Sequence, residues 1–354
     1  MDYLQHLNRL LETVVKENAS DLDISVNYVP HIRVTGQLIP LRQEKKVSAK
    51  DSEGLAFSIM SEAQKKKFSE EKEIDFSYDL KEMGRFRVNV FFQRGYVSIA
   101  LRFIPLKIRT IEDLNLPPIL HDFTSRPQGL VLVTGASSQG KSTTLAALID
   151  EINHTRAVHV ITIEDPIEYI YSPDRAVVEQ REVYQDTLSF DNALRATFRQ
   201  NPDVIMVGEM RDLETISTAI TAAETGHLVF ATLHTNSSSQ TIHRIVDVFP
   251  AEQQNQIRFQ LASSLLGIIS QRLIPGIKRG FVPACEVMVC NNAVATLIRE
   301  NKIHEIPAVI ETSAREGMIS YSRALVDLVR KKEISLKNAM DYSLDPSEIR
   351  NLLG

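Results

Sequence analysis

The stretch that decides the fold is residues 129–142, which read GLVLVTGASSQGKS. Its second part, from Gly135 to Ser142, fits the pattern Gly-x-x-x-x-Gly-Lys-Ser of a phosphate-binding loop. Residues 129–134 read as a buried strand and residues 141–152 as a helix, so the loop would precede the positive N-terminus of that helix. Strand, loop and helix in this order predict a nucleotide-binding site.

The residue types of the loop each suit a part of a nucleotide. Glycines let several backbone N–H groups point at one anion, while the Lys141 ammonium would reach the β- and γ-phosphates of ATP. The hydroxyl of Ser142 would ligate Mg²⁺. The residues predicted to bind the nucleotide are Gly135, Ala136, Ser137, Ser138, Gln139, Gly140, Lys141, Ser142 and Thr143.

Composition and charge disfavour several other classes of protein. The chain has 354 residues, enough for about two domains, and its net charge of -5 argues against a general nucleic-acid binder. No apolar run reaches about 18 residues and the N-terminus shows no export signal, so we expect no membrane span and a cytoplasmic protein. Cys285 and Cys290 are expected to be reduced and inert, because two thiols cannot complete a zinc site alone.

The pattern of predicted helices and strands changes near residue 105. Residues 1–105 combine an N-terminal helix, a charged helix over 49–70 and short alternating strands, which predicts a small α+β domain. Residues 106–118 read as a linker. In residues 119–354, strands predicted at 130–134, 158–163, 203–207 and 228–232 alternate with helices, which indicates a parallel, doubly wound α/β sheet. From residue 251 onward we expect mostly helix, beginning with one over 251–272.

Polar residues follow each predicted strand of this sheet. Ligands of such sheets bind at the carboxyl ends of the strands, where Glu164, Glu209 and His234 would join the phosphate loop. Glu209 suits an acid that holds Mg²⁺ through water, although it could merely favour the next helix N-terminus. Glu164 suits an acid that orients or deprotonates the attacking water, unless it only pairs with a base. Asp165 is either catalytic or a cap of the turn before Pro166.

Two further groups of residues have both a catalytic and a structural interpretation. His227 and His234 bracket the strand LVFATL, and a histidine near the γ-phosphate can donate a hydrogen bond to it. The alternative is a hydrogen-bonded structural histidine in each case. Arg87, Arg94 and Arg102 either reach a nucleotide across a domain or subunit boundary, as arginine fingers do, or lie on a solvated sheet face.

Long motifs distributed over essentially the whole chain resemble those of a known family. The chain is similar to the type IV pilus retraction (twitching motility, PilT-like) ATPases of the type II/IV secretion ATPase superfamily. The motifs that carry the resemblance are ASDLDIS at 19–25, GRFRVNVF at 84–91, ITIEDPIEY at 161–169, PDVIMVGEMRDLETI at 202–216 and AAETGHLVFATLHT at 222–235.

The resemblance implies a fold, an activity and partners. The fold would be a small PAS-like α+β domain followed by a RecA-like P-loop NTPase domain with a helical C-terminal portion. The activity would be Mg²⁺-dependent ATP hydrolysis by a homohexamer that drives pilus retraction, with Glu164 as the catalytic glutamate, Glu209 as the Walker B acid and the N-terminal arginines stabilising charge. The partners would be an inner-membrane pilus platform protein and the pilus base, placing the ring at the inner membrane through the pilus machinery.

The chain departs from the family pattern at three places, which leave alternatives open. One is Asn236, where the retraction enzymes often have threonine. The family loop usually reads Gly-x-Thr-Gly-Ser-Gly-Lys, and Ser138 replaces its inner glycine, at a cost of ~1–2 kcal/mol if the backbone there is left-handed. Residues 293–300 read AVATLIRE where the family reads AIRNLIRE, a motif associated with retraction. The alternatives are a catalytically weak accessory nucleotide-binding ring, and a pilus-extension or type II secretion ATPase.

Overall fold

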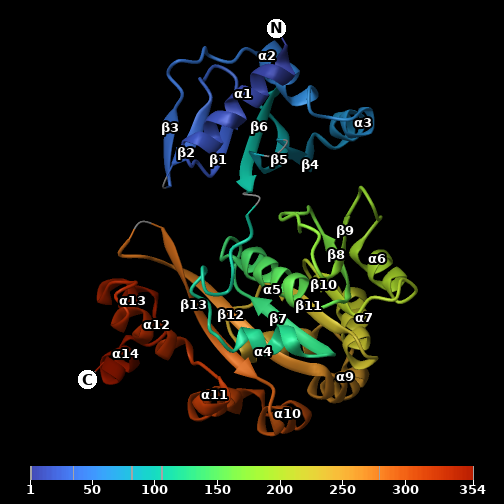
Figure 1. The fold of residues 1–354 in the computed structure, drawn as a ribbon, viewed down its shortest axis with the longest axis vertical. Coiled ribbons are helices and arrows are strands. Elements are labelled where there is room, and N and C mark those ends of the chain that lie inside the picture. The colour runs from blue at the N-terminus through green and yellow to red at the C-terminus, as the bar shows by residue number, and fades with distance from the viewer. Residues whose placement is uncertain (1, 35, 81–82, 105–106, 279, 354) are drawn as a thin grey trace. The chain divides into compact units, whose positions relative to one another are not determined.

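The computed structural model describes residues 2–34, 36–80, 83–104, 107–278 and 280–353 (Figure 1). The chain divides into two compact units: unit 1 is Met1–Lys107 with Pro166–Ile170, and unit 2 is Ile108–Asp165 with Tyr171–Gly354. The domain boundary expected at residues 105 and 106 lies outside the described residues. The side chains of Ile111, Leu114 and Leu116, in the segment expected to be a linker, are buried in a core of unit 2.

Unit 1 is an antiparallel sheet with the strand order β3-β2-β1-β6-β5-β4, and its described residues also form the helices α1, α2 and α3. Its elements are α1 (Tyr3–Lys16), β1 (Asp21–Ile24), β2 (His31–Val34), β3 (Gln37–Pro40), α2 (Ala49–Phe57), α3 (Glu62–Glu71), β4 (Glu73–Asp79), β5 (Arg85–Gln93) and β6 (Tyr96–Ile104). On β5, Phe86, Val88 and Val90 are buried while their neighbours are less so, the alternation of a strand with one covered face. The α+β interpretation of this region is therefore confirmed.

The single charged helix expected over residues 49–70 is wrong, because the chain forms two helices there. A new helix begins after Ser61, whose hydroxyl accepts a hydrogen bond from the backbone N–H of Gln64 at 3.3 Å. The Gln64 side chain in turn accepts one from the Ser61 backbone at 2.8 Å. This reciprocal capping box satisfies backbone donors that a continuous helix would have used internally, so it separates α2 from α3.

Unit 2 is built on a seven-stranded sheet with the order β13-β12-β7-β11-β10-β8-β9. All of its neighbouring strands pair in parallel except β12 and β13, which are antiparallel. Its elements are α4 (Leu120–Ser125), β7 (Gly129–Thr134), α5 (Lys141–Thr155), β8 (His159–Glu164), β9 (Val177–Glu182), α6 (Phe190–Thr197), β10 (Val204–Val207), α7 (Leu213–Glu224), β11 (Leu228–Leu233), α8 (Ser238–Asp247), α9 (Ala251–Ser264), β12 (Leu265–Pro275), β13 (Phe281–Val289), α10 (Asn292–Arg299), η2 (Ile303–Glu305), α11 (Ile306–Thr312), η3 (Ala314–Glu316), α12 (Tyr321–Arg330), α13 (Leu336–Tyr342) and α14 (Pro346–Leu353).

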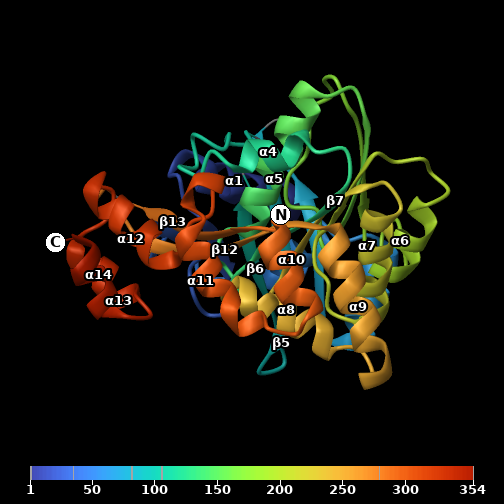
Figure 2. The ribbon, with the colours of Figure 1, turned by 90° about the horizontal axis from the view of Figure 1, so that it is seen from below.

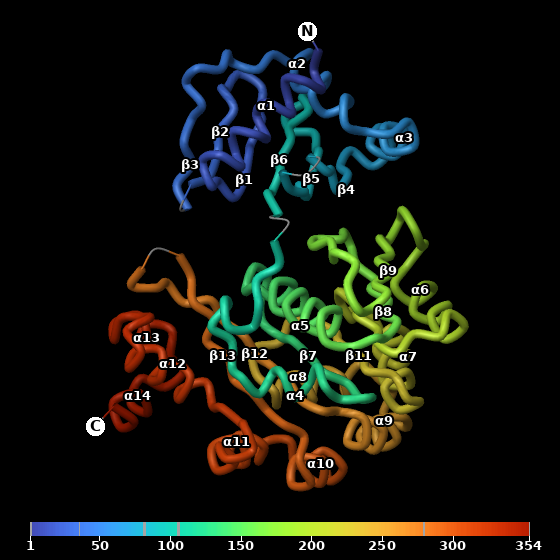
Figure 3. The backbone as a smooth tube through the Cα atoms, in the orientation of Figure 1, coloured from blue at the N-terminus to red at the C-terminus, as the bar shows by residue number. Residues whose placement is uncertain are grey.

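The middle strands of this sheet are buried on both faces. The backbone tube places β7 and β11 side by side, and every residue of both strands is buried (Figure 3). On β7, Leu130 and Leu132 pack in the core that contains residues of α7, α8 and α9, whereas Val131 and Val133 pack in the core that contains residues of α5. The expected parallel, doubly wound α/β sheet is therefore confirmed.

The helix expected over residues 251–272 is wrong in its second half. Helix α9 ends at Ser264, and Leu265–Pro275 forms β12, which pairs in parallel with β7. An apolar run such as Leu265–Ile269 does not distinguish a buried strand from a buried helix by periodicity, and burial in the sheet decides the outcome. The expected C-terminal helical region is present, and α12, α13 and α14 gather beside β13 (Figure 2).

His121, on α4, contacts both Glu112 in the segment before α4 and Glu151 on α5. The two ring nitrogens of His121 lie 2.8 Å from Glu151 Oε1 and 2.9 Å from Glu112 Oε1. The hydrogen bond to Glu151 is the main reason that the pKa of His121 is raised.

This contact predicts a pH dependence of stability. Because the pKa of folded His121 is raised, its stabilising contribution is complete below the unfolded pKa of about 6.5 and is lost as the pH rises through the folded pKa. Thermal unfolding of the wild type and of His121→Gln is therefore expected to differ more at pH 5.5 than at pH 8.5. A difference in melting temperature that grows with pH would contradict this assignment.

Candidate functional site

The phosphate loop connects β7 to α5 with a backbone that few residues can adopt. Gly135 follows β7 at a φ of 148°, and a Cβ there would lie 2.4 Å from the backbone oxygen of Gln271 on β12. Gly140, immediately before α5, has a φ of 81°. Ser138 also lies in the left-handed region, with a φ of 62°. These conformations curl the loop in front of the α5 N-terminus, as an anion site requires.

The ammonium of Lys141 is held inside this curl. Its Nζ donates hydrogen bonds of 2.9 Å to the backbone oxygens of Gly135 and of Ala136, and the residue is only 9% exposed. Ser142, the next residue, is exposed in the first turn of α5. The loop therefore presents a fixed cation and an exposed hydroxyl residue at one helix N-terminus, which suits phosphate and a cation bound to it.

Glu164 is the last residue of β8 and has a fixed orientation. Its Oε1 accepts hydrogen bonds from the hydroxyl of Thr162 at 2.7 Å and from the side-chain amide of Gln180 at 3.1 Å. The residue is 7% exposed. Both of these donors are neutral groups that orient the carboxylate, which suits a group that positions water.

Glu209 follows β10 and lies between two basic side chains. Its carboxylate is 2.8 Å from Arg211 and 3.0 Å from His234 Nε2. Burial raises the pKa of Glu209, but the hydrogen bonds and charges of Arg211 and His234 outweigh it, so the pKa is lowered overall. Glu209 is therefore held ionised, as an acid that attracts a cation must be.

The structure brings His234 to the expected edge of the sheet but not His227. His234 follows the C-terminal end of β11, whereas His227 precedes the N-terminal end of the same strand, seven residues or about 23 Å away at the opposite edge of the sheet. The backbone N–H and the Nδ1 of His227 both face the carbonyl oxygen of Ala222, at 3.1 and 3.0 Å. The expectation that His227 lies near the phosphate loop is therefore wrong within this chain. Its contacts with Ala222 instead cap the C-terminal end of α7.

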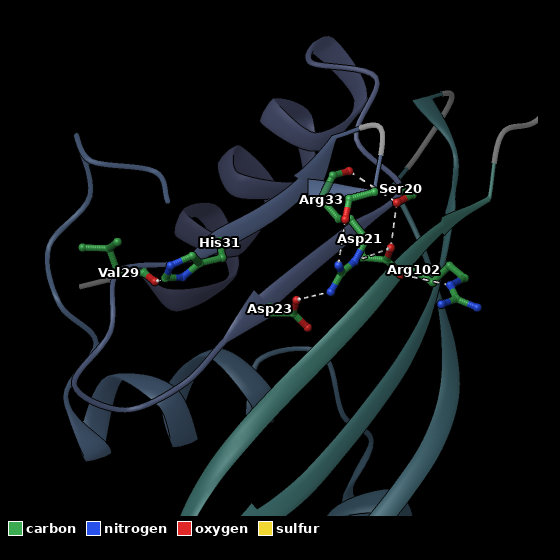
Figure 4. Close-up of polar contacts among 8 residues, drawn as sticks. Ser20, Asp21, Asp23, Val29, His31, Arg33 and Arg102 are labelled. Atoms are coloured by element: carbon green, nitrogen blue, oxygen red, sulfur yellow. Dashed lines mark hydrogen bonds and ion pairs between the residues drawn. The ribbon is translucent and has the colours of Figure 1, made fainter. Parts of the chain in front are cut away.

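The three arginines expected to stabilise charge belong to unit 1, and only two lie together. Arg87 on β5 and Arg102 on β6 are direct cross-strand partners. Arg102 Nε lies 2.9 Å from Asp21, which also contacts Arg33 (Figure 4). Arg94 sits in the β5–β6 turn with a φ of 53°, seven residues or about 23 Å along the strand from Arg87.

Residues that the sequence did not single out complete the site. Thr162 could have been found, since it lies two residues before Glu164 and so shares its face of the strand. Arg211 also had a signal, because it is two residues after Glu209 in the same turn. No sequence signal indicates Gln180, because the strand that carries it, β9, is not predicted from the sequence. Asp165 contributes to the raised pKa of Arg211, after Glu209, so it lies near this pair.

A cavity of about 550 Å³ adjoins Glu209. It is lined by Glu209, Met210, Arg211, Ile216, Leu233, His234, Thr235, Gln240, His243, Arg244 and Asp247. Among the described residues, no group of three or more histidine, cysteine or acidic side chains could hold a metal ion. A hydroxyl and a carboxylate, Ser142 and Glu209, fit the Mg²⁺ of a nucleotide, which takes few protein ligands besides phosphate and water. No helix in the described part of the chain is long and apolar enough to cross a membrane.

Comparison with known proteins gives this geometry a context. Residues 3–338 match the family described as "Type II/IV secretion system protein". The chain is 45% identical to the type IV pilus retractation ATPase PilT of Pseudomonas aeruginosa, over 96% of this chain and 98% of that protein. It is 38% identical to the type IV pilus ATPase PilU of the same organism, over 98% of this chain and 90% of that protein.

A solved structure agrees with these sequence relatives. The crystal structure described as the pilus retraction motor PilT with bound ADP superposes with a TM-score of 0.90 at 45% identity, covering 97% of this chain and 98% of the other. The resemblance to the pilus retraction ATPases and the fold class of an α+β domain followed by a RecA-like ATPase domain are confirmed. The chain belongs to the type II/IV secretion system protein family of P-loop ATPases.

Proposed function

We propose that this chain is the motor ATPase of type IV pilus retraction, and that it couples Mg²⁺-dependent ATP hydrolysis to the removal of pilins from the pilus base. The observation that carries the proposal is the meeting of the phosphate loop, Glu164, Glu209 and His234 at one edge of a parallel sheet. The full-length relative named as a retraction ATPase supports the choice of substrate and of biological role.

The side chains divide the chemistry between them. Lys141 and the N–H groups of residues 135–143 bind the phosphates, and Ser142 and Glu209 would hold the Mg²⁺, which would neutralise phosphate charge when bound. Glu164 orients the attacking water and accepts its proton, and the hydrogen bonds from Thr162 and Gln180 hold its carboxylate in a fixed orientation. His234 would donate a hydrogen bond toward the γ-phosphate while it contacts Glu209.

The assembly follows from the same resemblance. We propose a homohexamer in which arginines of unit 1 reach a bound nucleotide, and Arg87 and Arg102 are favoured over Arg94 because they share one sheet face. Such a ring would work in the cytoplasm and dock on an inner-membrane platform protein of the pilus machinery. His227 has no place at the phosphate edge in this proposal, for the reason given above.

One observation favours a second candidate function, an accessory nucleotide-binding ring that hydrolyses ATP weakly. Ser138 adopts a left-handed backbone conformation in which a glycine would be unstrained. A strained phosphate loop can slow turnover without preventing nucleotide binding. PilU, a relative that is named a type IV pilus ATPase without mention of retraction, is 38% identical to this chain.

A genetic experiment separates these functions. The chromosomal gene is replaced by alleles encoding Glu164→Gln or, as a matched control, Glu53→Gln, an exposed glutamate on α2. We expect the Glu164→Gln strain to accumulate surface pili and to lose twitching, and the control to behave as the wild type. Loss of surface pili would indicate an extension ATPase, and normal twitching would indicate an accessory ring; either result contradicts the proposal.

A further inference from the structure

The loop residue after Ser138 is anchored to strand β12 through both its side chain and its backbone. The side-chain oxygen of Gln139 accepts a hydrogen bond of 2.6 Å from the backbone N–H of Leu273. Its backbone oxygen accepts one of 2.7 Å from the side-chain amide of Gln271. Two hydrogen bonds therefore fix residue 139 directly beside the left-handed Ser138.

Gln271 also reaches the helix that follows the loop. It is 3% exposed, and its side-chain oxygen accepts a hydrogen bond of 2.7 Å from the hydroxyl of Thr144 on α5. A buried amide is costly unless its donors and acceptors are used, and here hydrogen bonds engage both its oxygen and its nitrogen. One side chain thus connects β12, the phosphate loop and α5.

Strand β12 lies so close to the phosphate loop that a side chain at Gly140 would collide with Gln271. A Cβ at Gly140 would lie 2.9 Å from Nε2 of Gln271, so the amide lies directly against the end of the loop. Gln139 stands where the family loop usually has serine, and Ser138 where it has glycine. The glutamine side chain at 139 reaches the backbone N–H of Leu273. The departure at 139 therefore adds an anchoring contact directly next to the departure at 138.

We propose that Gln139 and Gln271 are positioning residues that clamp the phosphate loop to β12 and hold it in its nucleotide-binding conformation despite the serine at position 138. A serine resists the left-handed conformation that the loop requires, whereas a glycine adopts it freely. The clamp replaces the missing glycine, and restoring glycine at 138 makes the clamp dispensable. This inference rests on nucleotide binding by the same loop, which is part of the proposed function.

The clamp has a distinct kinetic signature. The loop N–H groups contact phosphate in both the ground state and the transition state, so a loosened loop weakens nucleotide binding and raises KM while kcat changes little. Loss of one intramolecular hydrogen bond corresponds to about a fivefold to tenfold change in affinity. Gln139→Ala is therefore expected to weaken ADP binding by that factor and to raise KM for ATP while kcat changes little.

The test is calorimetric titration of ADP into the wild type, Gln139→Ala, Ser138→Gly and the double variant, with KM and kcat for ATP measured alongside. Gln128→Ala, an exposed glutamine just before the start of β7, is the matched control and should bind as the wild type. We expect Gln139→Ala to bind ADP about fivefold to tenfold more weakly, and the double variant to recover wild-type affinity. Gln139 lies on the surface loop, so this variant avoids disturbing the buried Gln271.

Two outcomes would overturn the clamp while leaving the proposed function intact. One is wild-type ADP affinity in Gln139→Ala, and the other is a loss of affinity that Ser138→Gly does not repair. A wild-type protein that binds no ADP would instead overturn both the clamp and the ATPase function. If the ADP titrations give the expected pattern but the genetic experiment shows no retraction defect, the retraction function is overturned and the clamp is supported.

Discussion

Lys141→Ala is expected to reduce nucleotide affinity by about a hundredfold and to abolish measurable ATP turnover. The ammonium is buried inside the loop, and its hydrogen bonds to the oxygens of Gly135 and Ala136 hold it at the N-terminus of α5, where the proposed function places the β- and γ-phosphates. Charge-assisted hydrogen bonds contribute about 1.5–3 kcal/mol each, so a lysine that donates two to the phosphates would account for at least a hundredfold in affinity. Titration with ADP and a phosphate-release assay measure the two effects.

A matched substitution separates this effect from a general loss of positive charge. Lys337, on α13, is exposed, and Lys337→Ala should retain wild-type affinity and turnover. Circular dichroism of both variants should match that of the wild type, because Lys141 contacts the loop rather than a hydrophobic core. ADP affinity within twofold of the wild type in Lys141→Ala would show that the phosphates lie elsewhere.

Glu164→Gln is expected to slow hydrolysis by about a hundredfold or more and to leave ATP binding close to normal. Glutamine has nearly the same shape and can still accept the hydrogen bonds of Thr162 and Gln180 through its oxygen. It cannot accept a proton from water, and loss of a general base typically costs 10²–10⁴-fold in rate. Single-turnover hydrolysis with prebound ATP measures the chemical step without the binding step.

The outcome that would contradict the role of Glu164 is equally direct. A variant whose single-turnover rate stays within threefold of the wild type would show that Glu164 only supports the fold at the end of β8. A variant that also loses ATP binding would show that the carboxylate contributes to the structure of the nucleotide site, and the assignment as general base would fail.

The parts of the site that could be predicted from the sequence are those set by local chain order. A buried strand, a glycine-containing loop and a helix place Lys141 without knowledge of distant residues, and acids directly after apolar strands must lie at the carboxyl edge of a parallel sheet. Glu164 and Glu209 were found in this way. The position of His227 could have been corrected by the same logic, because a residue before a strand lies at the opposite edge from a residue after it.

The parts that could not be predicted depend on contacts between distant segments. Residues 265–269 are apolar without a strand period, so the sequence predicts a continuation of helix α9. Pairing with β7 and β13 makes this segment the strand β12. The clamp residue Gln271 lies on that strand, so it was missed with it. Gln180 was missed because β9 is a short, partly exposed edge strand whose charged sequence gives little signal.

The measurement that tests the central claim most directly is Mg²⁺-dependent ATP hydrolysis by the purified wild-type chain, with bound nucleotide quantified in the same sample. We expect steady phosphate release that stops when Mg²⁺ is chelated, because the phosphate loop, Glu164 and Glu209 all follow strands at the same edge of the parallel sheet. Nucleotide bound at full occupancy without phosphate release would contradict a retraction motor and indicate an accessory ring.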